Sequence, residues 1–232
     1  MLVIAPVAVR PGARETIGQI RHDNMDSPLR DKSNGYEEHA ETFIRARNPR
    51  IGPDVVREWC RTLASGASVL DLGCGSGVPI TQVLLEEGLE VWAVDASEAM
   101  LRAFRARFPG VPAECAAAED STFFHRSFDA ILAWGLMFLL AEEAQVAVIA
   151  RAAKALNPHG QFVFTAAHDP VRWNDSITGR ESVSLGAERY VNLLESEGLR
   201  VQHGKIDAGE NYYFFATNPE PRNPAEVRSD TR

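Results

Sequence analysis

Three glycines at alternate positions, Gly73, Gly75 and Gly77, are the residues of this chain that best allow a ligand to approach the backbone. They follow an apolar run over 68–72 and precede a predicted helix over 80–87. Glycine lets the chain turn tightly with no Cβ in the way. The run has the composition of a parallel strand covered on both faces, and the start of a helix carries a partial positive charge. The stretch therefore predicts a turn that binds a nucleotide-like cofactor.

Two acidic residues and one missing glycine narrow the choice of cofactor. Asp71 lies in the strand before the turn, and Asp95 lies near the end of a predicted second strand over 90–97. An acid at the second position can accept hydrogen bonds from ribose hydroxyls. The dinucleotide fingerprint requires glycine where Val78 stands, and the phosphate-loop pattern requires a Gly-Lys-Ser/Thr that does not follow. Both of those cofactor classes are disfavoured.

The glycine turn and the segments after it resemble, in order, the motifs of the class I S-adenosylmethionine (SAM)-dependent methyltransferases. The resemblance extends over about 36–217, and its motifs are 69–78, 94–97, 117–120, 128–135 and 156–164. It implies a Rossmann-like α/β fold. That fold is a doubly wound, mostly parallel seven-stranded sheet with an antiparallel last strand and helices on both faces.

The resemblance also implies SAM as the cofactor and assigns residues to it. These are Asp71, Gly73, Cys74, Gly75, Gly77, Asp95, Ala96, Glu119, Asp120, Ala133 and Trp134. Asp120 is the side chain expected beside the adenine, although both acids of that pair would also suit a solvated loop. Trp134 could present its ring face to the sulfonium or could serve only in packing.

Periodicity and breaker residues predict the remaining elements. Helices are expected over 36–47, 53–64, 97–108, 141–156 and 187–197, and strands over 112–118, 127–134, 161–167, 199–206 and 212–217. The segment 168–184 has little periodicity, so it is expected to be a long irregular loop near the ligand.

The first predicted helix places Tyr36, Ala40, Phe43 and Ile44 on one face. This face suits either a lid over the site or an ordinary amphipathic helix packed on the sheet. Resemblance to the family favours the lid. The predicted organisation is a mobile extension over 1–32, a methyltransferase domain over 33–217 with the lid-like helix at 33–48, and a loose tail over 218–232.

Charge and cysteine content exclude several classes of protein. The chain of 232 residues has 32 acidic and 24 basic side chains, a net charge of −8, so a general nucleic-acid-binding surface is not expected. Its three cysteines lack metal-ligand spacing, which favours a reduced, cytoplasmic setting and predicts no metal site. No apolar run is long enough to span a membrane, and the first nine residues lack the basic start of a secretory signal.

The chemistry implied by SAM is an in-line displacement, for which alignment and exclusion of water matter most. A hydroxyl acceptor would also need a general base. His168, at the end of the fifth strand, is the candidate for that base, and His39 is the next, although both also suit surface or packing positions. Besides Trp134, the aromatic residues expected at the substrate are Tyr36, Phe43, Phe138, Trp173 and Tyr212.

The sequence leaves several functions open. The aromatic set favours a small, partly apolar acceptor. The segment 133–136 lacks the Pro-Pro-aromatic pattern used on amide and base nitrogens, and with the acidic charge this counts against an RNA or protein acceptor. A SAM-binding protein without transferase activity is a further alternative, and a nicotinamide-dependent dehydrogenase is a distant one. Nothing in the sequence specifies the acceptor atom or the oligomeric state.

Overall fold

The computed structural model describes residues 31–202 and 204–219. Most of the expected N-terminal extension and of the expected C-terminal tail lies outside the described residues. Of those two segments, only residues 31–32 and 218–219 are described.

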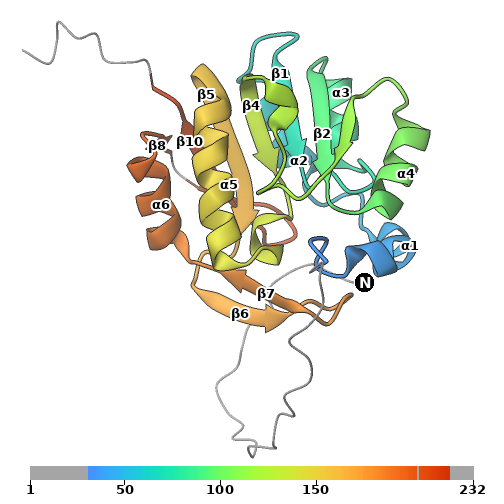
Figure 1. Cartoon of the computed structure of the whole chain (residues 1–232). Helices are drawn as coiled ribbons and strands as arrows, with labels where there is room; N and C mark the ends of the chain where they lie inside the picture. The colour runs from blue at the N-terminus through green and yellow to red at the C-terminus, as the bar shows by residue number, and fades with distance from the viewer. Residues whose placement is uncertain (1–30, 203, 220–232) are drawn as a thin grey trace, which may run out of the picture.

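An eight-stranded mixed sheet forms the centre of the fold (Figure 1), with strand order β3-β2-β1-β4-β5-β10-β8 and with β9 also paired to β10. The strands are β1 (Ser68–Leu72), β2 (Glu90–Asp95), β3 (Ala113–Cys115), β4 (Phe128–Ala133), β5 (Leu156–Ala166), β8 (Arg200–Val201), β9 (Lys205–Ile206) and β10 (Tyr212–Thr217). β1 to β5 pair with one another in parallel, and β10 is antiparallel to β5, β8 and β9. The expected mostly parallel sheet with an antiparallel last strand is confirmed.

The sheet has eight strands rather than the expected seven, because the segment expected as one strand over 199–206 forms β8 and β9. Gly204 lies between these two short strands. A Cβ on Gly204 would lie 2.0 Å from the hydroxyl oxygen of Tyr212. The backbone therefore passes closely over this tyrosine and does not continue one regular strand.

Helices cover both faces of the sheet, as expected. They are α1 (Tyr36–Ala46), α2 (Pro53–Cys60), α3 (Ile80–Glu86), α4 (Glu98–Arg107), α5 (Glu142–Ala155) and α6 (Ala187–Ser196). α5 and α6 pack on one face, and α2 and α3 on the other (Figure 1). α4 packs on Ala93, which shares a sheet face with Val91 of the α2–α3 cluster. No helix in residues 31–202 and 204–219 is long and apolar enough to cross a bilayer.

Several element boundaries differ from those expected. α2 ends at Cys60 rather than near residue 64. There, Thr62 donates both its backbone N–H and its hydroxyl to the Trp59 carbonyl, which closes a tighter turn. β3 has three residues instead of the seven expected over 112–118, and β5 begins at Leu156 rather than at 161.

The expectation of an irregular loop over 168–184 is wrong, because this segment forms the hairpin β6 (Val171–Asn174) and β7 (Glu181–Ser184). Asp175 organises its turn. One carboxylate oxygen of Asp175 accepts hydrogen bonds from the N–H groups of Ile177 and Thr178, and its own N–H donates to the Arg180 carbonyl. Each strand has only four residues, too few for a clear alternating pattern. Figure 1 shows the hairpin crossing the end of the molecule near α1.

α1 is held between α4 and this hairpin. The Glu37 carboxylate accepts hydrogen bonds from the Ser97 hydroxyl at 2.7 Å and the Ala99 N–H at 3.0 Å, at the start of α4. At the other side, the Tyr36 hydroxyl donates to Asp175 at 3.0 Å. α1 therefore lies across the carboxyl ends of the parallel strands, where ligands bind in doubly wound sheets.

Candidate functional site

The glycine turn at the end of β1 is shaped by contacts with β2 and α4. The N–H groups of Gly73 and Cys74 both donate to the Val94 carbonyl, at 2.8 and 3.1 Å. Gly75 and Gly77 have φ angles of +55° and +80°, a region that disfavours other residues. A Cβ on Gly77 would also lie 2.4 Å from the Phe108 ring, whereas one on Gly75 would meet only open space and Phe43. Gly77 is required for packing, and Gly75 leaves room for a ligand.

The Asp95 carboxylate is fixed at the end of β2 by two backbone hydrogen bonds. One oxygen accepts from the Gly75 N–H and the other from the Ser97 N–H, each at 2.8 Å. Burial raises the pKa of Asp95 to about 6, the two hydrogen bonds oppose this shift, and the charge of Glu37 adds to it. The sequence-predicted acid therefore joins the glycine turn to the second strand.

Asp71 is a buried carboxyl beside the same turn, with an exposed fraction of 1%. The Thr81 hydroxyl donates to it at 2.6 Å. Burial raises its pKa to about 7, and the nearby charge of Asp95 contributes to the shift. A cationic group of a ligand in front of Asp71 would favour the ionised carboxylate, so this position suits an ammonium.

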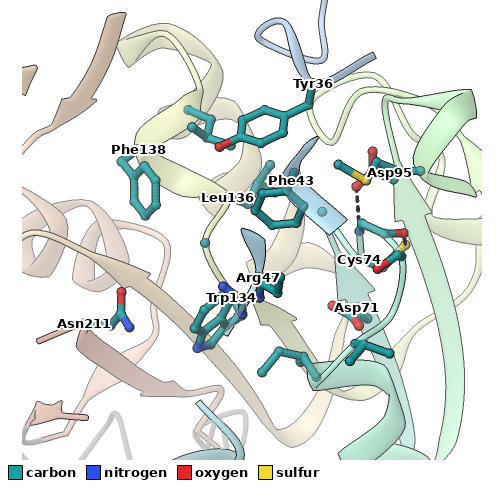
Figure 2. Close-up of a pocket in the computed structure, with 18 residues that line it drawn as sticks. Tyr36, Phe43, Arg47, Asp71, Cys74, Asp95, Trp134, Leu136, Phe138 and Asn211 are labelled. Atoms are coloured by element: carbon teal, nitrogen blue, oxygen red, sulfur yellow. Dashed lines mark hydrogen bonds between the residues drawn. The ribbon is translucent and has the colours of Figure 1, made fainter. Parts of the chain in front are cut away.

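A cavity of about 770 Å³, including its open part, lies between α1, the glycine turn and the end of β4 (Figure 2). Sequence-predicted residues in its lining are Tyr36, Phe43, Asp71, Gly73, Cys74, Gly75, Asp95, Trp134 and Phe138. A second cavity, of about 380 Å³, adjoins it and shares Gly73, Asp95, Leu136 and Leu139. Its lining contains Ala96 and Ala118, at the tips of β2 and β3.

The two acids expected beside the adenine, Glu119 and Asp120, differ in how far their side chains are exposed. Both pair with Lys32, Glu119 at 2.7 Å and Asp120 at 3.4 Å, and Lys32 lines the second cavity. The Glu119 side chain is 13% exposed, and its second oxygen has no hydrogen-bond partner in the described part of the chain. The Asp120 side chain is 61% exposed. Glu119 is therefore the more buried of the two acids, and neither of them lines either cavity.

His168, Trp173 and Tyr212 do not line either cavity, contrary to expectation. The His168 ring packs edge-on against Tyr212 and is close to the Asp169 carboxylate on the surface. This happens because β5 ends at Ala166 and the chain then turns away from the cavity toward the hairpin. Trp173 contacts Phe138 from behind the cavity wall, with ring centres 5.5 Å apart. His39, the second candidate base, has its Nδ1 3.0 Å from the Gly35 carbonyl oxygen.

Gly77 and Ala133 support the site from outside the two cavity linings. Ala133 is fully buried in β4, and Gly77 is packed under α4. The ring of Trp134 lines the cavity, but one face is covered by the Arg47 guanidinium, 4.0 Å from the ring centre, and its N–H donates to the Tyr213 hydroxyl. That face cannot also receive a sulfonium.

Sequence reasoning missed Arg47 and Asn211, which both line the larger cavity. Burial lowers the pKa of Arg47 to about 10, and the side chain makes no ion pair with any described carboxylate. Arg47 follows Tyr36, Ala40 and Phe43 on the same helix face, so extending that face by one turn would have found it. Asn211 precedes β10 in a loop, and no sequence pattern distinguishes it.

The fold is a Rossmann-like domain, and comparison with known proteins shows which proteins the chain is similar to. Residues 69–160 match the family described as a methyltransferase domain. An uncharacterised methyltransferase of Mycobacterium tuberculosis is 35% identical over 108 residues, 47% of this chain and 43% of that protein. The cypemycin N-terminal methyltransferase of a Streptomyces species is 32% identical over 137 residues, 56% of this chain and 55% of that protein. The chain thus spans about half the length of these relatives.

Solved structures agree on the fold. The 1,6-didemethyltoxoflavin-N1-methyltransferase of Burkholderia thailandensis superposes with a TM-score of 0.67 at 19% identity, covering 84% of this chain and 94% of that one. A SAM-dependent methyltransferase from Clostridium acetobutylicum gives a TM-score of 0.62 at 16% identity, covering 79% and 99%. Residues 69–160 therefore match a methyltransferase domain, and the solved structures show that the fold is the one seen in such enzymes.

Replacing Asp71 by asparagine should stabilise the ligand-free protein, and more at about pH 8 than at about pH 5. The folded-state pKa of Asp71 is raised to about 7, whereas a carboxyl of an unfolded chain titrates near ~4. Such a carboxyl contributes stability that is lost as the pH rises through its folded pKa. Asparagine stays neutral and its amide oxygen can still accept from Thr81. The gain in unfolding free energy of Asp71→Asn over the unmodified chain, measured by chemical denaturation, should be larger at about pH 8 than at about pH 5 by on the order of 2 kcal/mol.

Asp120→Asn is the matched control, because the Asp120 side chain is 61% exposed. Its unfolding free energy should differ from that of the unmodified chain by a similar amount at both pH values. A gain for Asp71→Asn that did not change with pH would contradict a buried, partly neutral Asp71.

Proposed function

We propose that this protein transfers the methyl group of SAM to a small-molecule acceptor by in-line displacement. The observation that carries the proposal is the Asp95 carboxylate at the junction of the two cavities, held by the N–H groups of Gly75 and Ser97. Ribose hydroxyls would donate to this carboxylate. The adenine then extends into the smaller cavity and the methionine part into the larger one.

Two groups in the larger cavity, and one carboxylate outside both cavity linings, suit a ligand of this chemistry. Arg47 lacks a carboxylate partner among the described residues and would pair with the carboxylate of the methionine part. The free oxygen of Glu119 would accept from the exocyclic amine of the adenine. Asp71 would face the ammonium group. The ammonium, the carboxylate and the adenine amine of SAM would thus each meet a group of the chain with the opposite charge or with a free hydrogen-bond acceptor.

When bound, SAM supplies a methyl group already activated by its positive sulfur. The chain's own residues align the reactants and exclude water. α1 covers the larger cavity with Tyr36 and Phe43, and Phe138 forms part of the wall at the end of β4. These three residues are the proposed substrate contacts. His168 is not proposed as a general base, because its ring lies on the surface against Tyr212.

The enclosure of the cavity favours a small acceptor. α1 and the β6–β7 hairpin lie over the carboxyl ends of the strands and are joined by the Tyr36–Asp175 hydrogen bond. A folded macromolecule could not reach the methyl group through these elements without displacing them. The net charge of −8 also disfavours an RNA acceptor, although a tRNA U34 carboxymethyltransferase is among the relatives, at 29% identity over 138 residues.

A peptide terminus is the second candidate acceptor. The cypemycin N-terminal methyltransferase and the glycopeptide N-methyltransferase MtfA are both similar to this chain, by sequence and by fold respectively. A flexible chain end could enter a covered cavity where a folded surface could not.

Replacing Asp95 by alanine should weaken SAM binding by about 100-fold, since it removes hydrogen bonds between a carboxylate and the ribose hydroxyls. Isothermal calorimetry with SAM measures the change. Glu38→Ala is the control, because Glu38 is an exposed residue of α1 and lines neither cavity. Equal affinity in Asp95→Ala and in the unmodified chain would reject the proposed cofactor position.

Glu119→Gln should weaken SAM binding by about tenfold, whereas Asp120→Asn should leave it nearly unchanged, because only Glu119 has a buried carboxylate oxygen free to accept from the adenine. The two substitutions make the same chemical change at neighbouring residues that both pair with Lys32. A larger loss for Asp120→Asn would restore that residue as the adenine contact.

Transfer of the labelled methyl group of SAM into a cell extract should place the label in the small-molecule fraction after separation by size. The Asp95→Ala variant provides the background, because it should bind little SAM. Label in a peptide fraction would favour the second candidate, and label in RNA or large proteins would contradict a covered cavity. Binding of SAM without any transfer would identify a SAM-binding protein that is not a transferase.

A further inference from the structure

A third cavity, of about 350 Å³ including its open part, adjoins the larger cavity on the side opposite Asp95. We call it the side cavity. It shares Phe43, Arg47, Trp134 and Asn211 with the larger cavity. No described residue lines both the side cavity and the smaller cavity, which meets the larger one at Asp95. Figure 2 shows Asn211 and Asp95 at opposite sides of the larger cavity. The three cavities therefore form a series with the larger one in the middle.

This order leaves the side cavity for the acceptor, so the inference rests on the proposed function. With the adenine in the smaller cavity and the methionine part in the larger one, the methyl group lies in the middle of the series. The side cavity meets the larger one at Trp134, the residue directly after β4, at the carboxyl ends of the parallel strands. An acceptor held there approaches the methyl group from the side away from the adenine.

The lining of the side cavity is mostly apolar. It consists of Phe43, Ala46, Ile51, Trp134 and Ile177, together with Arg47, Asn48 and Asn211. No aspartate, glutamate, lysine or histidine among the described residues belongs to this lining. A cationic acceptor would meet Arg47 with no opposing charge, and in the proposed function Arg47 already pairs with the methionine carboxylate. An uncharged molecule with a large apolar part is the ligand that this lining fits.

Ile177 is an apolar residue in an otherwise polar turn. The turn between β6 and β7 reads Asp-Ser-Ile-Thr-Gly-Arg over 175–180, and such turns favour Asp, Ser and Gly. The Ile177 side chain is half-buried and belongs to none of the hydrophobic clusters formed by the described residues, yet it lines the side cavity. It therefore contributes an apolar surface to this cavity rather than to the core.

The walls of the side cavity are fixed by contacts between distant segments. The Ile177 N–H donates to Asp175 at 2.9 Å, and the Tyr36 hydroxyl of α1 donates to the same carboxylate. A Cβ on Gly209 would lie 2.5 Å from the Ile51 side chain, so the loop before β10 packs directly on Ile51. α1, the hairpin turn and this loop thus hold the two isoleucines at the cavity.

We propose that the side cavity binds the body of the acceptor, that the acceptor is a neutral, largely apolar small molecule, and that Ile51 and Ile177 determine this specificity. The reacting atom of the acceptor extends past Trp134 to the methyl group. Its new bond to the methyl carbon forms as the C–S bond breaks, and sulfur keeps the electron pair. A hydrogen on the reacting atom leaves as a proton to solvent.

Two substitutions of Ile177 test the proposal with labelled SAM and a cell extract. Ile177→Trp should lower transfer into the small-molecule fraction by roughly tenfold or more, because the larger ring fills the side cavity. Ile177→Asn should lower it by about tenfold, because an apolar contact is lost. Asparagine suits a turn, so this variant should fold. Both variants should bind SAM as tightly as the unmodified chain in calorimetry, since Ile177 does not line the larger cavity.

Ser176→Trp and Ser176→Asn are the matched controls. Ser176 is the exposed neighbour of Ile177 in the same turn and lines none of the three cavities. Both control variants should transfer the label at the rate of the unmodified chain. The labelled product should also pass from neutral water into ethyl acetate, as an uncharged, largely apolar molecule does.

The outcomes distinguish this inference from the proposed function. If the unmodified chain does not bind SAM, or binds it and labels nothing, the proposed function fails and the inference falls with it. If small molecules are labelled but the Ile177 variants match the Ser176 variants, or the product stays in water, the inference is overturned while the proposed function stands. If Ile177→Trp also weakens SAM binding, its ring has reached the larger cavity, and Ile177→Asn decides.

Discussion

The hydrogen bonds from Gly75 and Ser97 to the Asp95 carboxylate are the interactions on which the rest of the site depends. They join the glycine turn, the end of β2 and the start of α4 around one charge. A partly buried carboxylate is stable only where donors compensate for lost hydration, and here the backbone supplies them. The two cavities adjoin at this residue, so its position sets how any ligand lies across the carboxyl edge of the sheet.

Several charged groups of the site lack a full set of partners for their charge or their hydrogen bonds. Asp71 is buried with one hydroxyl donor, Arg47 lies on an aromatic ring without a carboxylate, and one oxygen of Glu119 has no partner among the described residues. Each arrangement is unfavourable in the absence of a ligand, because buried polar groups usually find partners. In the proposed function, these groups would meet the ammonium, the carboxylate and the adenine amine of SAM.

Two carboxylates outside the lining of the larger cavity hold polar side chains that belong to that lining. Asp175 accepts a hydrogen bond from the Tyr36 hydroxyl, and Asp207 accepts from the Asn211 amide nitrogen. Asp175 is 139 residues away from Tyr36 in the sequence, and it also organises the turn of the hairpin that crosses α1. The same residue therefore links closure of the site to the orientation of a group within it.

The sequence by itself determined the glycine turn, the two acids Asp71 and Asp95, the parallel core of the sheet and the aromatic face of α1, because these depend on local backbone geometry and short-range periodicity. Other features were decided only by the tertiary structure. These are the split of the last edge strand, the hairpin over 171–184, the place of Arg47 and Asn211, the burial of Glu119 beside an exposed Asp120, and the surface position of His168. Each of these depends on which side chain a distant segment covers, neutralises or leaves exposed. Such contacts between distant segments form only when the sheet, α1 and the hairpin pack together.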